Sequence, residues 1–194
     1  TKKFVHHKPE KELLGAGVMN ADRGSLLAEK LKKKRIDLPI DKLLRQLADP
    51  SKLKLIEETQ IALVEKIQVG SREELIGQKQ LVVKLAASTK VEVRRMAIWA
   101  LGRCDDIRLS PIMLKGLQDP NLGVVIEARD ALCCLSRRPL GFGLPADPRS
   151  KIPVTATEDE RKAVIAKWRQ QLVKRWHTWY LRVRPYDERD DLLE

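Results

Sequence analysis

A 31-residue repeat in the middle of the chain is the feature that most constrains its fold. When 91–101 is shifted forward by 31 residues onto 122–132, the apolar residues and the alanines fall in register. The matched pairs are Val91 with Leu122, Val93 with Val124, Ala97 with Ala128, Ala100 with Ala131 and Leu101 with Leu132. Small residues at fixed positions allow neighbouring helices to approach closely. A segment that recurs at a fixed period therefore predicts stacked units, each of which buries its apolar face against the next.

The segments around this repeat are patterned as helices separated by short turns. Apolar side chains recur with helical spacing at 40–47, and Asp49-Pro50 ends that helix. Further helices are expected from Leu53 to Gly70, from a capping box at Ser71 and Glu74 through Leu85, from Val91 to Cys104, from Leu109 to Gln118 and from Leu122 to Arg137. Because no strand-like alternation competes with this pattern, the sequence predicts an all-α fold of antiparallel helix pairs.

Two of these helix pairs carry a shared motif, an Asp-Pro turn followed by Val-x-x-x-Ala-x-x-Ala-Leu. The motif is found at Asp119-Pro120 with Val124, Ala128, Ala131 and Leu132, again at Val93, Ala97, Ala100 and Leu101 without the Asp-Pro, and in a looser copy after Asp49-Pro50. The pattern resembles that of HEAT-type (HEAT-like) helical repeat proteins of the bacterial type. The resemblance covers residues 40–138 and implies an α-solenoid of about three HEAT-like helix pairs.

Three extensions flank these repeats. Residues 1–39 are expected to form a basic arm with a short helix, since 1–35 hold ten basic and four acidic side chains, a net +6 of the chain's +11. Residues 139–157 form a proline-rich strap, predicted to be extended and anchored by Phe142 and Leu144. Residues 158–194 comprise a long amphipathic helix and an acidic tail. The helix starts after a capping box at Thr157 and Glu160 and is expected to run to about Arg184, where Pro185 ends it.

The long last helix combines an apolar stripe with a basic surface. Trp168, Trp176, Trp179 and Tyr180 fall close to one stripe, and 161–184 contain eight basic and no acidic side chains. In one interpretation, the stripe covers the open end of the helical stack, whose last apolar layer must be buried. In the other, part of the stripe contacts another molecule, because Trp and Arg concentrate binding energy at interfaces.

The candidate partner-binding residues follow from the basic arm, an arginine pair and the last helix. They are Lys32, Lys33, Lys34, Arg35, Arg94, Arg95, Trp168, Arg175, Trp176, Trp179 and Tyr180. The net charge of +11 and a pI near 9.7 favour acidic partners. We expect other protein subunits of a larger assembly, self-association included. Nucleic acid is the alternative, and its binding would weaken steeply with salt.

Candidates for catalysis and metal binding are few. The histidines lie in the arm (His6, His7) and on the last helix (His177), and neither Cys-x-x-Cys nor His-x-x-x-His spacing occurs. We therefore expect no catalytic residue, no cofactor and no metal. The expected function is a non-catalytic scaffold or accessory subunit of a larger assembly, such as a filament or a multi-subunit enzyme. The resemblance adds a HEAT-like lyase as a second alternative.

The cysteines and the hydropathy bear on the compartment. Cys104, Cys133 and Cys134 all fall in apolar helical patterns, so we expect buried free thiols rather than a disulfide framework. This favours a soluble protein in a reducing intracellular compartment. No apolar run reaches the roughly 18 residues that span a bilayer, so no membrane insertion is expected. Because the chain begins at Thr1 rather than Met, export after removal of a signal peptide stays an alternative.

Overall fold

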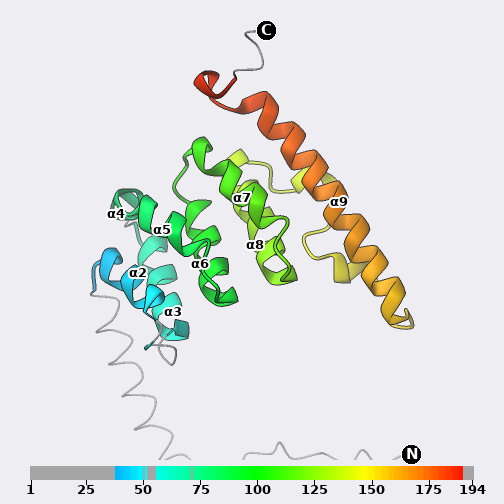
Figure 1. Cartoon of the computed structure of the whole chain (residues 1–194), viewed down its shortest axis with the longest axis horizontal. Helices are drawn as coiled ribbons and strands as arrows, with labels where there is room; N and C mark the ends of the chain where they lie inside the picture. Colours follow the sequence, from blue (N-terminus) through cyan, green and yellow to red (C-terminus); the bar gives the residue numbers. More distant parts are fainter. Residues whose placement is uncertain (1–37, 50, 52–55, 71, 190–194) are drawn as a thin grey trace, which may run out of the picture.

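The computed structural model describes residues 38–49, 51, 56–70 and 72–189 (Figure 1). These residues form α-helices and short 3-10 helices, and no strand occurs among them. The predicted all-α fold is therefore confirmed for this part of the chain. Most of the predicted basic arm, with Lys32, Lys33, Lys34 and Arg35, lies outside the described residues, as does the end of the acidic tail.

The helices follow one another with short connections. The α-helices are α2 (Ile40–Ala48), α3 (Ile56–Gln68), α4 (Arg72–Gly77), α5 (Lys79–Leu85), α6 (Val91–Leu101), α7 (Ser110–Gly116), α8 (Leu122–Ser136) and α9 (Glu158–Val183). The 3-10 helices are η2 (Ile107–Leu109), η3 (Gly141–Gly143), η4 (Pro148–Lys151) and η5 (Tyr186–Glu188).

The α-helices pack mainly against their neighbours in the chain. Helix α2 contacts α3, α5 contacts α6 and α7 contacts α8; between these pairs, α2 contacts α5, α3 contacts α6, and α6 contacts both α7 and α8. Figure 1 shows the resulting row from α2 and α3 to α7 and α8, with α9 lying beyond α7 and α8. A single cluster of buried apolar side chains runs from α2 to α9.

Helices approach each other closely at small residues, among them two alanines of the repeat. A Cβ on Gly102 would lie 2.7 Å from the Cα of Ala131, a distance that real side chains do not tolerate. A Cβ on Gly116 would lie 2.8 Å from Cδ1 of Ile98 and 3.0 Å from Cβ of Ala128. Ala128 and Ala131, two of the matched alanines, therefore lie at close contacts between helices, as the sequence predicted.

One expected helix is broken in two. The sequence predicted a continuous helix from the Ser71 region to Leu85, but the structure separates α4 from α5 at Gln78, whose backbone angles are φ −102° and ψ 10°. Gly77 immediately precedes the break, and glycine is a poor helix former. The prediction of one continuous helix is wrong because the chain bends at Gly77 and Gln78.

The last helix has the predicted start and length. The Thr157 hydroxyl accepts a hydrogen bond from the backbone N–H of Glu160, and the Glu160 carboxylate accepts one from the backbone N–H of Thr157. These reciprocal bonds satisfy two amides at the helix start. Helix α9 then continues for 26 residues and ends just before Pro185.

The strap differs from the extended course predicted for it, because local capping folds parts of it into turns. Asp147 accepts a hydrogen bond from the backbone N–H of Arg149, 2.9 Å away, and so caps η4. At η3, Gly141, Phe142 and Gly143 all have positive φ, which folds the chain into a tight turn. Phe142 and Leu144 pack against the core cluster, so both predicted anchors are confirmed.

Candidate functional site

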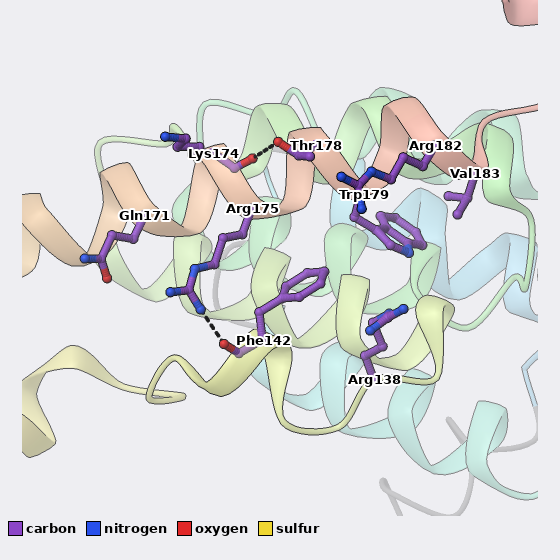
Figure 2. Close-up of a pocket in the computed structure, with 9 residues that line it drawn as sticks. All are labelled: Arg138, Phe142, Gln171, Lys174, Arg175, Thr178, Trp179, Arg182 and Val183. Atoms are coloured by element: carbon purple, nitrogen blue, oxygen red, sulfur yellow. Dashed lines mark hydrogen bonds between the residues drawn. The ribbon is translucent and has the colours of Figure 1, made fainter.

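A groove of about 670 Å³ runs along α9 where this helix faces the end of α8 and the η3 turn (Figure 2). We call it the basic groove; it is lined by Arg138, Phe142, Gln171, Lys174, Arg175, Thr178, Trp179, Arg182 and Val183. The α9 residues of this set recur every three or four positions, so they share one face of the helix. From Gln171 to Val183 this face extends for about 18 Å.

Four cations line the basic groove, and no carboxylate does so among the described residues. Arg138, Lys174, Arg175 and Arg182 are all exposed, and none forms an ion pair with a described Asp or Glu. The Arg138 guanidinium lies 5.2 Å from the centre of the Phe142 ring. Because no anion of the described chain neutralises these groups, the groove carries a positive field directed at solvent.

Aromatic rings form the apolar part of the groove and of the core beneath it. Phe142 meets the buried Trp176 edge to face, with ring centres 4.9 Å apart, and Trp176 meets Trp179 in the same way at 5.3 Å. Arg175 donates a hydrogen bond to the carbonyl oxygen of Phe142 (Figure 2). The η3 turn is therefore attached to α9 through both its side chain and its backbone.

The four aromatic residues predicted to contact a partner lie in the protein's own core. Trp168, Trp176, Trp179 and Tyr180 are between 0% and 8% exposed, and α9 contacts α7. The Trp168 indole N–H donates to the carbonyl of Pro145 at 3.0 Å. The stripe is therefore buried within the molecule, as the first interpretation requires. Of the four, Trp179 lines the basic groove.

The predicted arginine pair on α6 lies apart from the basic groove. Arg94 forms two hydrogen bonds to the Asp119 carboxylate, at 2.8 and 3.1 Å, and also donates to the carbonyls of Ser88 and Thr89. Burial opposes the ionisation of Asp119, but the hydrogen bonds outweigh it and lower the pKa of this carboxyl. Arg94 thus joins α6 to the turn after α7. Arg95 is half exposed beside Glu127, in a separate cavity of about 240 Å³.

Sequence reasoning missed several residues that build the basic groove. Arg138, Phe142, Lys174 and Arg182 were not among the candidate partner-binding residues, although Arg175 was. The spacing of Lys174, Arg175 and Arg182 on one helix face was a usable signal. Arg138 and Phe142 reach the groove through a turn with positive φ, and no local sequence pattern predicts this turn.

Two of the three cysteines are buried. Cys104 and Cys133 are buried as expected, and burial raises the pKa of Cys104 to about 11, but Cys134 is exposed, so the expectation is wrong there. Cys133 and Cys134 are neighbours on a helix and therefore point to different faces. In the described part of the chain no cluster of His, Cys, Asp and Glu is placed to hold a metal ion.

The described helices were also compared with the length and hydropathy that a membrane span requires. None of them meets both requirements.

In comparisons with protein-family models, curated proteins and solved structures, none matches this chain.

Proposed function

We propose that this chain is a non-catalytic accessory subunit, an α-solenoid of HEAT-like helix pairs that binds other protein subunits and holds a larger assembly together. The observation that carries the proposal is the basic groove, in which four unneutralised cations surround aromatic rings. Arginine and aromatic side chains are enriched at protein interfaces and dominate their binding energy. A positive groove also favours and accelerates the approach of an acidic partner.

The packing of the helices supports a rigid binding platform. Each helix pair contacts mainly the next pair, the arrangement that a linear repeat stack requires. Gly102 on Ala131 and Gly116 on Ala128 bring the helices of the later pairs together without space between them. Such a stack exposes long side faces and two ends, and α9 covers the end next to α7. The basic groove lies on this cover, where a partner can reach it.

Nucleic-acid binding is the second candidate, favoured by the same cations. The charge along α9 reverses at both ends, however, with Glu158, Asp159 and Glu160 in the first turn and Asp187 and Glu188 just after the last. A polyanion that extends past Val183 would approach Asp187 and Glu188, and one that extends about 16 Å beyond Gln171 would reach the carboxylates of the first turn. A short acidic part of a protein fits the charge pattern better.

An affinity pull-down with the full chain tests the proposal. We expect wild-type protein to retain specific partner proteins from an extract of its own cells, with or without nuclease. The variant Lys174→Glu/Arg182→Glu reverses two groove cations and should lose these partners. The control Lys162→Glu/Lys167→Glu makes the same change of charge elsewhere on α9 and should keep them.

Two results would contradict the proposal. Partners that disappear on nuclease treatment would indicate nucleic-acid binding. A chain that retains no specific protein, and that sediments as a monomer at all concentrations, would leave an accessory subunit without support.

A further inference from the structure

The basic groove has cations on two sides and an apolar centre between them, and this combination indicates what it binds. Figure 2 shows Arg138 across the groove from α9, with the rings of Phe142 and Trp179 between Arg138 and the α9 backbone. Lys174 and Arg182 project from α9 itself. A bound segment can therefore pair with cations on both sides while it covers an apolar centre.

The apolar centre is held in place before any partner binds. Phe142 packs on the buried Trp176, its carbonyl accepts a hydrogen bond from Arg175, and its φ of 60° is a conformation that few aromatic residues adopt. These contacts keep the η3 turn against α9. A preformed surface of this kind needs little ordering on binding, so more of the contact energy contributes to affinity.

The dimensions and charges select a short acidic peptide segment over other anions. The groove length of about 18 Å equals three turns of helix, about twelve residues, or five to six residues of extended chain. Its volume of about 670 Å³ is enough for one or two large side chains. A free phosphate would leave Phe142 and Val183 uncovered. Bases stack on ring faces, and Trp179 is only 8% exposed.

We propose that the basic groove binds a short acidic segment of a partner protein that carries one large apolar side chain. The apolar side chain packs on Phe142 and Val183, which are more exposed than Trp179, and the flanking carboxylates pair with Arg138, Lys174 and Arg182. Arginine pairs with carboxylates in a planar, two-bond geometry, which adds specificity to the attraction. This inference rests on the proposed function and names the partner's chemistry at the same groove.

Fluorescence anisotropy with a defined probe tests this inference. The probe is a fluorescein-labelled peptide of about twelve residues, all Asp and Glu except for one central Phe. We expect Lys174→Glu/Arg182→Glu to weaken binding by about tenfold or more, because two attractive pairs become repulsive. The control Lys162→Glu/Lys167→Glu should stay within about twofold of wild type, since its charges lie outside the groove. Arg138→Gln, on the opposite side, should weaken binding independently.

Changes in the probe separate the two kinds of contact. Replacing the central Phe by Ser, or all carboxylates by amides, should each weaken binding by about tenfold. Equal affinities for the Phe and Ser peptides would overturn the inference, because charge alone would then account for binding. Equal losses of affinity in Lys174→Glu/Arg182→Glu and in its control would also overturn the inference. Tighter binding of a single-stranded DNA of similar charge would do the same.

The peptide-binding experiment and the pull-down can fail independently of each other. If the pull-down retains partners that do not depend on Lys174 and Arg182, the chain is still a binding subunit, but the acidic segment is not what holds them. If the probe binds the groove specifically and the extract supplies no partner, the chemistry of the groove stands and the accessory role does not. Unchanged circular dichroism and thermal unfolding of all variants show that these losses do not come from misfolding.

Discussion

The contact between α6 and α8 and the contact that α9 makes with the rest of the molecule use side chains of opposite size. Beside α8, Gly102 lies against Ala131, and backbone meets backbone. On α9, the buried residues include the large rings of Trp168, Trp176 and Trp179. At Gly102 and Ala131 there is no space between the two backbones, whereas the basic groove opens where α9 meets the η3 turn. The two contacts therefore differ in the size of the side chains that they bury, and the basic groove opens beside the contact with the large rings.

The two contacts also satisfy their polar groups differently. Within the repeats, the hydrogen bonds between residues far apart in the chain go mainly to carboxylates, as from Arg94 to Asp119 and from Lys79 to Asp106. Around α9, arginines donate to loop carbonyls: Arg161 to Val154 and Ala156, and Arg169 to Pro120. Prolines have no N–H, so a proline-rich strap has fewer donors than acceptors of its own. The basic helix thus serves the fold as well as the groove.

The largest expected effect is the loss of a ring from the α9 contact. Trp176→Ala should lower the free energy of unfolding by about 3–5 kcal/mol, because it leaves a large cavity at a fully buried position. Urea denaturation followed by circular dichroism measures this loss. The control Trp176→Phe should lose less, since the indole N–H has no hydrogen-bond partner to forfeit. If both variants were as stable as wild type, the rings would not hold α9 in place.

A smaller loss of stability is expected at the contact between α6 and α8, where small residues pack together. Gly102→Ala should cost about 1–3 kcal/mol, because its Cβ would overlap Ala131. The same substitution at Gly77, where no atom lies within 4 Å of the added Cβ, should cost nothing, since alanine is the better helix former. Urea denaturation of the two variants side by side checks the difference. Equal stability of the two would mean that backbone contact between α6 and α8 is not required.

The Arg94–Asp119 pair gives the repeats a pH dependence. Asp119→Asn should cost about 1–3 kcal/mol at neutral pH. Because the pKa of Asp119 is lowered in the folded protein, its contribution is present above the ordinary value of 3.8 and disappears as pH falls through the lowered value. Thermal unfolding of wild type and variant should therefore converge in acid. Asp105→Asn, at the exposed pair with Arg72, should have a smaller effect at every pH.

The smallest loss of stability is expected at the C-terminal end of α9. The Tyr180 hydroxyl donates to the Glu188 carboxylate, and burial, together with this bond, raises the pKa of Tyr180 to about 12. Tyr180→Phe should cost about 0.5–1.5 kcal/mol at neutral pH. A raised pKa means that this contribution is complete below pH 10.0 and is lost as pH rises through about 12. Thermal unfolding across this range should show wild type losing its advantage, and a constant difference would contradict the assignment.

Local patterns predicted most of the helices because their causes are local. The capping box at Thr157 and Glu160, the stop before Pro185 and the Ala register of the repeat all lie within a few residues of what they control. The break at Gly77 and Gln78 was missed because the apolar spacing continues across it. The exposed Cys134 was missed because an apolar helix pattern does not say which neighbour faces the core.

The candidate site could be predicted only in part. Arg175 and Trp179 were named from the last helix, and both line the groove. Arg94 was named for its charge, but Asp119, 25 residues away in the chain, neutralises it. Charge in a sequence does not show which cations are already paired. That depends on contacts between residues far apart in the chain.

By itself, the sequence determined an all-helical chain with an internal repeat, a capped basic last helix and an aromatic stripe that needed burial. Periodicity, caps and small residues act over one or two helical turns, so they can be read along the chain. The tertiary structure alone decided that Arg138 and Phe142 meet Lys174, Arg175 and Arg182 across a groove. This meeting requires the η3 turn to adopt positive φ and to be held there by α9, and only the folded packing supplies the contacts that stabilise it.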